Sequence, residues 1–94
     1  MKVITLHHVL SDTGSNAQGI ILFDLMKQHH NEIVVLEISA DLSLSSSFLN
    51  SSFGQFIDCY GIQTLKSNVK IRTNKNQFAR ISKYINDYAA LSHA

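Results

Sequence analysis

Residues 33–60 constrain the fold more than any other part of the chain. The stretch opens with an apolar, mostly β-branched run, 33–38, which only Glu37 interrupts. Such a run is typical of a strand that is buried on both faces of a sheet. A polar turn ending in Ser45–Ser47 follows, and beyond it apolar residues recur at helical spacing. The stretch therefore predicts a strand, a serine turn and a helix that begins at this turn.

Length and composition exclude several classes of protein. The 94 residues are 45% hydrophobic and carry a net charge of +1, which suits one small globular domain spanning residues 1–94. No apolar run approaches the roughly 20 residues of a membrane span, and no secretory leader is recognisable. The single cysteine, Cys59, cannot form an intrachain disulfide. We expect it to be a buried, inert thiol in a reducing, cytoplasmic protein.

Alternating strand and helix patterns extend from this stretch over the whole chain. They predict strands near residues 2–8, 33–39 and 69–73, and helices near 16–30, 47–60 and 75–91. Lysine and arginine alternate with apolar residues in the last strand, which is typical of a half-exposed sheet edge. Short connections favour an α/β sandwich, in which a sheet that includes parallel strands is covered by about three helices.

Helical spacing also predicts the side chains of the core. The first helix should bury Ala17, Leu22, Ile21, Leu25 and Met26. The second should bury Leu49, Phe53, Phe56, Ile57 and Tyr60, and Gly61 should end it as a C-terminal cap. The last should bury Phe78, Ile81, Tyr84, Ile85, Tyr88 and Leu91.

No catalytic or metal-binding pattern is visible, so we expect neither a metal nor a cofactor. His7 and His8 are adjacent in a predicted strand and should point to opposite faces, where they cannot bind one ion. Gly14 and Gly19 flank a helix start but lack the lysine and hydroxyl residue of a phosphate loop. A small enzyme remains an alternative, because catalytic partners can be distant in sequence. Its candidate groups are the histidines, Asp12, Asp24, Glu37 and Asp41.

Basic residues are concentrated late in the chain, and no acid occurs between Asp58 and Asp87. This pattern fits a solvated face or, as an alternative, a nucleic-acid-binding surface. The aromatic residues among them have core spacing rather than the freedom to stack on bases, so the solvated face is favoured. The basic set is Lys66, Lys70, Arg72, Lys75, Arg80 and Lys83.

The segment SSSFLNSSFGQFIDCYG resembles the STAS-like family of small bacterial proteins of unknown function. These are relatives of the sulfate-transporter and anti-sigma-factor-antagonist domain. The resemblance extends over the helix led by Gly19, the strand IVVLEIS, and Leu65 through VKIRTN. It implies a STAS-like fold and a non-catalytic, regulatory module that binds another protein.

In anti-sigma-factor antagonists, a strand leads into an aspartate-serine-serine-glycine turn, and a partner kinase phosphorylates the first serine. Ser46 is the nearest match, with Ser45 in place of the aspartate and Phe48 in place of the glycine. The resemblance implies docking on a protein partner, such as an ATPase or kinase-like protein or a larger effector, with homo-oligomerisation as a further option. Its candidate contact or phosphorylation residues are Ser45, Ser46, Ser47, Phe48 and Asn50. Simple helix capping by the serines is the alternative.

Overall fold

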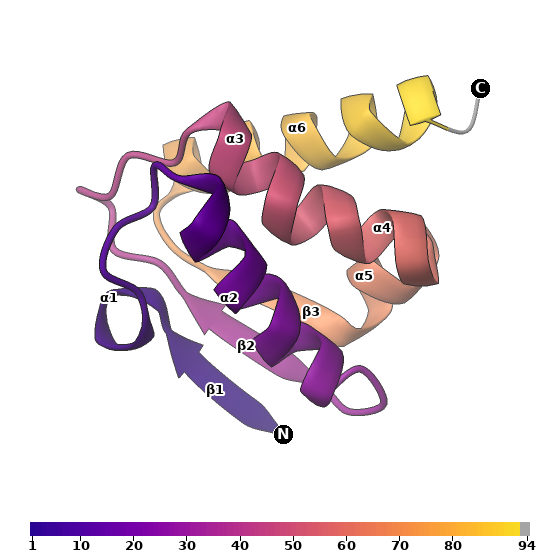
Figure 1. Ribbon diagram of the computed structural model, residues 1–94, viewed down its shortest axis with the longest axis horizontal. Helices are drawn as coiled ribbons and strands as arrows, with labels where there is room; N and C mark the ends of the chain where they lie inside the picture. Colours follow the sequence, from indigo (N-terminus) through magenta and orange to yellow (C-terminus); the bar gives the residue numbers. More distant parts are fainter. Residues whose placement is uncertain (93–94) are drawn as a thin grey trace.

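A three-stranded parallel sheet underlies the fold of the computed structural model, which describes residues 1–92 (Figure 1). The order is β1–β2–β3, and Ile4 of β1, Leu36 of β2 and Ile71 of β3 lie side by side. The strand predicted from residues 33–39 is therefore central. The predicted α/β fold with parallel strands is confirmed. The strands are β1 (Lys2–Thr5), β2 (Val34–Glu37) and β3 (Val69–Arg72).

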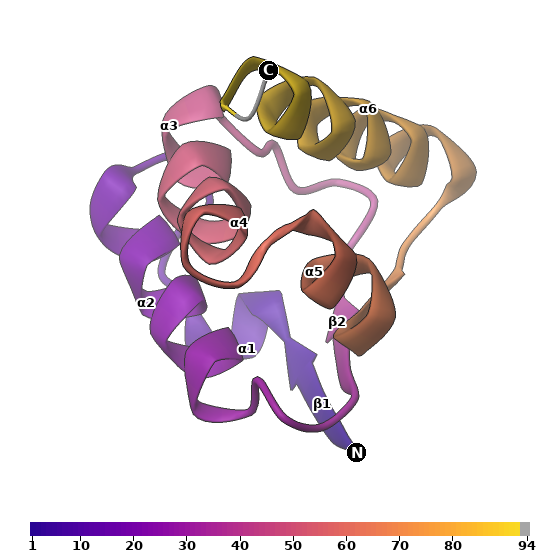
Figure 2. The same cartoon turned by 90° about the vertical axis from the view of Figure 1, so that its right-hand side faces the viewer.

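Helices connect the strands and lie on one side of the sheet (Figures 1 and 2). Sequential parallel strands joined by right-handed crossovers place successive connections on the same face. The first connection contains α1 (Leu6–Val9) and α2 (Asn16–Gln28). The second contains α3 (Ser46–Leu49), the π-helical segment η1 (Asn50–Gly54), α4 (Gln55–Tyr60) and α5 (Ile62–Asn68). The chain then forms α6 (Lys75–Ser92).

The opposite face of the sheet carries no helix within residues 1–92. Side chains alternate along a strand, so Val3, Val35 and Lys70 form one row on this open face. Val3 is 43% exposed, and Val35 is buried but lies outside the hydrophobic core cluster. The central strand has buried residues on both faces, as predicted, since Val34, Val35 and Leu36 are all buried. Helices cover only one of these faces, because both crossovers pass over the same side of the sheet.

A polar ladder crosses the carboxyl end of this open face. The Thr5 hydroxyl donates to Oε1 of Glu37 at 2.8 Å, and Nη1 of Arg72 donates to Oε2 at 2.8 Å. The Thr5 hydroxyl, followed by the Arg72 guanidinium, holds the pKa of the Glu37 carboxyl below its ordinary value. One carboxylate thus links all three strands.

The helices enclose one hydrophobic core with the sheet. Phe48, Phe53 and Phe56 are all fully buried in it. Burying a side chain of this size contributes roughly 1.5–3 kcal/mol to folding. The core face predicted for the second helix is confirmed for Leu49 and Ile57, and Tyr60 packs against the core while partly buried.

The buried face of α2 is rotated from the predicted one. Ala17 and Ile21 are exposed, whereas Leu22, Phe23 and Met26 are buried. The rotation brings the buried Gly19 against α3, which allows the two helices to approach closely. The helical spacing of apolar residues in α2 is compatible with burial of either face, so it does not predict the contact between Gly19 and α3.

One predicted boundary was wrong, and one helix was not predicted. The first strand ends at Thr5, and the N–H of Leu10 donates to the carbonyl oxygen of Leu6 at 2.9 Å to close a helical turn. This turn buries both leucines. Between the predicted helix 47–60 and the predicted strand 69–73, where no element was expected, the structure has the helix α5, which buries Leu65. Gly61, with φ of 87°, ends α4 as predicted and lets the chain start this next helix.

The last helix buries a narrower stripe than predicted. Ile81 and Ile85 are buried, but Phe78 is 48% and Leu91 is 85% exposed. The cause is the outer position of α6, which leaves more of its surface uncovered (Figure 2). Cys59 is also exposed, so its predicted burial was wrong. None of the helices in residues 1–92 has the length and apolarity to cross a bilayer.

Candidate functional site

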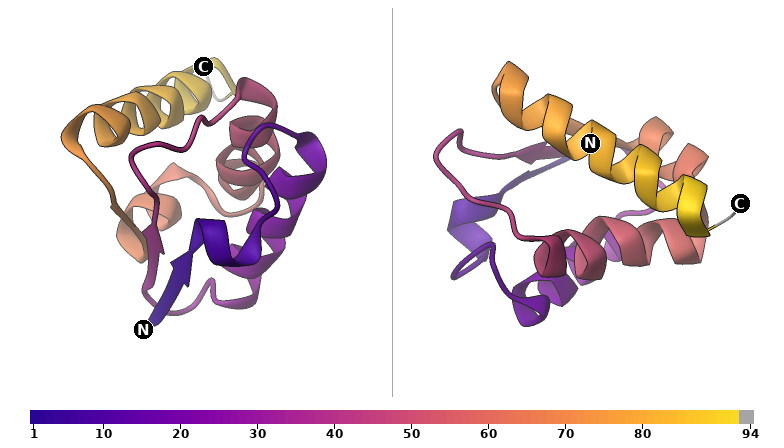
Figure 3. Two further views of the ribbon diagram at one scale, coloured as in Figure 1. Left: turned by 90° about the vertical axis from the view of Figure 1, so that its left-hand side faces the viewer. Right: turned by 90° about the horizontal axis from the view of Figure 1, so that it is seen from above.

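Two loops meet at the carboxyl ends of β1 and β2, where ligand sites of α/β proteins commonly form. Residues 11–15 lead into α2 and residues 39–45 lead into α3, so the two helix starts lie side by side (Figure 3). The Thr13 hydroxyl donates to the carbonyl oxygen of Ser43 at 2.6 Å, and the N–H of Ser45 donates to the carbonyl oxygen of Thr13 at 3.1 Å. These bonds hold the serine turn on the first loop.

Ser45 is the cap of α3. Its Oγ accepts from the N–H of Phe48 at 3.1 Å and donates to the carbonyl oxygen of Gly14 at 2.9 Å. The hydroxyl therefore satisfies one unpaired helix donor and ties the cap to the neighbouring loop. The capping alternative is confirmed for this serine.

Ser46, Ser47 and Asn50 are exposed on the first turns of the helical stretch, and we call these three residues the serine surface. Phe48, between them in sequence, is fully buried. Its side chain packs in the core and cannot contact a partner in this conformation. Of the five candidate contact residues, the structure thus presents three, uses Ser45 as the cap and buries Phe48.

A hollow of about 140 Å³ adjoins the serine surface between α3 and α6. Ser46, Arg80 and Tyr84 are among the residues that line it. Burial, followed by the nearby Tyr88, raises the pKa of Tyr84 above its ordinary value. The sequence placed Arg80 only in the basic set and contained no signal that would bring it beside Ser46.

The amide of Gln77 joins α6 to the loop before the serine turn. This residue is 5% exposed, and its Nε2 donates to the carbonyl oxygen of Leu42 at 2.9 Å. The N–H of Gln77 in turn donates to Oδ1 of Asn74 at 2.8 Å, as in a helix cap. The loop is therefore held from both sides, by Thr13 and by Gln77.

A π-helical turn follows the serine surface. The N–H of Gln55 donates to the carbonyl oxygen of Asn50, five residues earlier. The buried Ser52 hydroxyl donates to the carbonyl oxygen of Phe48 at 2.7 Å, which supplies a partner inside the irregular turn. π-Helical turns are rare and occur frequently at functional sites. The sequence analysis predicted an ordinary helix here.

The basic residues take several different positions. Arg72 pairs with Glu37 on the open sheet face, and Lys83 pairs with Asp87 at 2.6 Å. Lys66 and Lys70 border a groove between β3 and α6, whereas Arg80 lines the hollow near Ser46 and Lys75 is exposed at the start of α6. Nucleic-acid binding by this set stays a prediction.

The histidines and acids that the sequence singled out lie at several separate places in the described residues. No group of three metal-ligating residues occurs there. Nδ1 of His29 lies 3.0 Å from Oε2 of Glu32, and this contact lowers the pKa of the glutamate. His7 and His8 are exposed on α1 rather than on a strand, with ring centroids 4.5 Å apart. Asp41 accepts a hydrogen bond from Ser39.

A parallel sheet with helices over one face and a serine-capped helix after the central strand makes this chain a small α/β domain, and this architecture is consistent with a STAS-like fold. The family model for the STAS-like domain of unknown function (DUF4325) matches residues 18–77, and the chain belongs to this family. The match includes the serine surface and the whole of β2 and β3. No curated protein and no solved structure matches the chain.

Proposed function

We propose that the chain is a non-catalytic regulatory or accessory subunit in the bacterial cytoplasm. It docks through the serine surface and the exposed side of the helix that follows onto an ATPase, a kinase-like protein or a larger effector. The observation that carries this proposal is the exposure of Ser46, Ser47 and Asn50 on a turn whose cap is fully engaged.

The rigidity of the turn supports its use in recognition. The hydrogen bonds of Thr13, Ser45 and Gln77 hold it before any partner arrives, so binding orders few additional groups. The polar side chains of the serine surface keep it soluble without a partner and can form hydrogen bonds across an interface.

The surroundings of Ser46 also suit control by negative charge. A helix N-terminus interacts favourably with an anion, and Arg80 lines the same hollow. A phosphate on Ser46 would be tolerated by the fold. In a complex, the phosphate would be buried against the partner and would lose its hydration. If the partner supplies no cation, this desolvation costs several kcal/mol. Phosphorylation would therefore release the partner and leave the domain folded.

The test uses the full chain, tagged and expressed in its native host, with a photocrosslinking residue at one position at a time. Substitution at Ser47 or Asn50 should crosslink one and the same protein, and substitution at the exposed Gln28 of α2 should not. Equal crosslinking from position 28, or none from the serine surface, would overturn the proposal.

Charge variants then test the role of Ser46. Ser46→Asp should reduce recovery of the crosslinked protein at least about tenfold, a loss of about 1.4 kcal/mol, while Ser46→Ala should retain it. The melting temperature should stay nearly unchanged for Ser46→Asp, because the helix terminus favours the charge by about 0.3–1 kcal/mol. Equal recovery with wild type and Ser46→Asp would remove this turn from the interface.

A further inference from the structure

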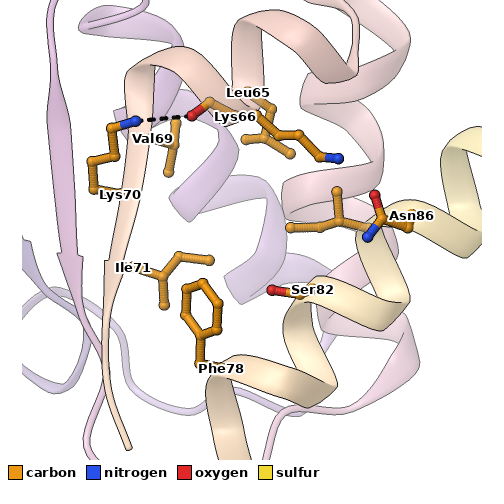
Figure 4. A pocket seen from close by; sticks show the side chains of 9 residues that line it. Leu65, Lys66, Val69, Lys70, Ile71, Phe78, Ser82 and Asn86 are labelled. Atoms are coloured by element: carbon orange, nitrogen blue, oxygen red, sulfur yellow. Dashed lines mark hydrogen bonds between the residues drawn. The ribbon is translucent and has the colours of Figure 1, made fainter. Parts of the chain in front are cut away.

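A groove of about 410 Å³ lies between β3 and α6, away from the serine surface (Figure 4). Its volume is within the range of roughly 300–1,000 Å³ that is typical of binding pockets. Apolar side chains form most of its walls, and Lys66, Lys70, Ser82 and Asn86 add polar groups at its border. The apolar residues are Leu65, Val69, Ile71, Phe78 and Ile85.

The groove leaves apolar surface without a covering element. Phe78 is 48% exposed although helical spacing predicts it in the core, and Ile71 is half-buried beside it. In Figure 4 both side chains point into the space between the strand and the helix. An exposed aromatic ring next to an aliphatic side chain in a concave site is typical of a docking surface.

The same groove borders a free strand edge. In the described part of the chain, β3 pairs with β2 alone. The carbonyl oxygen of Arg72 accepts from the N–H of Ile38 at 3.0 Å, so the backbone of Arg72 faces β2. Backbone groups of successive strand residues alternate in direction, and the N–H and carbonyl of Ile71 therefore point to the outer edge. Such unpaired groups are a template for an additional strand.

The charges at the groove favour an acidic partner. Nζ of Lys70 donates to the carbonyl oxygen of Lys66 at 3.0 Å, which holds the Lys70 ammonium beside the groove. Neither lysine pairs with a carboxylate among the described residues. No acid occurs in the sequence between Asp58 and Asp87. The ammonium groups of Lys66 and Lys70 could therefore pair with carboxylates of a bound partner.

We propose that this groove binds an extended, acidic segment of a partner protein, which adds to the free edge of β3 as a fourth strand. Alternate side chains of the segment, being apolar, enter the groove against Ile71 and Phe78. Its carboxylates lie near Lys66 and Lys70. Main-chain hydrogen bonds to the free edge supply affinity and the side-chain pattern supplies specificity, as in other cases of strand addition.

A second copy of this chain fits the groove less well. The other free edge of the sheet is β1, which begins with the exposed Lys2. Edge-to-edge pairing of two copies would bring this cation towards Lys66 and Lys70, and like charges directly opposed are unfavourable. A small apolar carboxylate would use the groove and the lysines but would leave the Ile71 backbone groups unpaired.

The experiment begins with selection of a random dodecapeptide display library against the full chain. The expected result is enrichment of peptides in which apolar residues alternate with aspartate or glutamate. The best peptide is then synthesised and its affinity measured for wild type and four variants. Phe78→Ser and Lys70→Glu should each weaken binding about tenfold or more. The matched controls Ile20→Ser, at a similarly exposed apolar position, and Lys27→Glu, at another exposed lysine, should change it less than about twofold.

Amide hydrogen exchange distinguishes strand addition from simple occupation of the groove. Binding of the peptide should slow exchange of the Ile71 amide strongly. A peptide whose central backbone nitrogens are methylated should lose affinity while it retains its side chains. Lack of enrichment, unchanged Ile71 exchange, or full binding of the methylated peptide would each overturn the proposal. Self-association of the chain that disappears in Phe78→Ser would assign the groove to a second copy and would overturn it as well.

Discussion

Gly19 of α2 lies so close to Phe48 of α3 that a Cβ atom at position 19 would be 2.6 Å from the Phe48 carbonyl oxygen. The same atom would be 2.8 Å from Cβ of Ser51. Both neighbours are on the helix that carries the serine surface, and one is backbone. The absence of a side chain at position 19 therefore sets the distance between α2 and the helical stretch that begins at the serine turn.

Gly19→Ala should destabilise the fold. Overpacking costs typically about 1–3 kcal/mol, and the gain in helix propensity of about 1 kcal/mol offsets only part of it. Gly14→Ala is the matched control, because a Cβ there has no neighbour within 4 Å and its φ is not positive. Urea denaturation of both variants gives the free energy of unfolding. Equal stability of the two variants would show that the helices can move apart without cost.

Ser45→Ala should lower stability by about 1 kcal/mol, because the N–H of Phe48 loses its cap. Ser46→Ala, one residue later and exposed, should remain within about 0.5 kcal/mol of wild type. Thermal unfolding by circular dichroism compares the two. A larger loss for Ser46→Ala would mean that the cap is assigned to the wrong serine.

Phe56→Ala should cost about 3–5 kcal/mol, because the ring is fully buried. A domain of this size has only about 5–15 kcal/mol of stability in total. Phe78→Ala removes the same ring from a half-exposed position and should cost much less. Chemical denaturation at neutral pH measures the difference. Similar losses at the two positions would contradict the assignment of Phe78 to an open groove.

Glu37 should make the free energy of unfolding depend on pH in the acidic range. Its pKa is below the ordinary value, chiefly because of the Thr5 hydroxyl and then because of Arg72. Its contribution to stability is therefore present above the unfolded pKa of about 4.3, and disappears as pH falls through the lower folded value. Glu37→Gln should be less stable than wild type at pH 7, with a difference that narrows below about pH 4.

Urea denaturation of wild type and Glu37→Gln at a series of pH values tests this. Thr5→Val removes the larger cause and should shift the acid transition of wild type upward in pH. A difference between wild type and Glu37→Gln that is constant from neutral to acidic pH would contradict the role of the ladder.

Periodicity and turn residues were sufficient to predict the order of the main elements. The apolar, β-branched run at 33–38 places apolar side chains on both faces of a strand, which favours a central position in the sheet. The start of the helix after Ser45 follows from local capping chemistry. Gly61 ends its helix because its positive φ is a property of that residue. The serine turn as a candidate site could be identified for the same reason, since its signal lies within a few consecutive residues.

Long-range packing determined everything that the local pattern left open. Phe78 has the spacing of a core residue but is exposed, because the outer position of α6 leaves this part of the helix uncovered. Arg80 comes beside Ser46, and Arg72 beside Glu37, only through contacts between elements that are far apart in sequence. A one-dimensional pattern records which residues share a face of one element. It carries no information on what covers that face, and this cover decides where the hollow, the groove and the open sheet face lie.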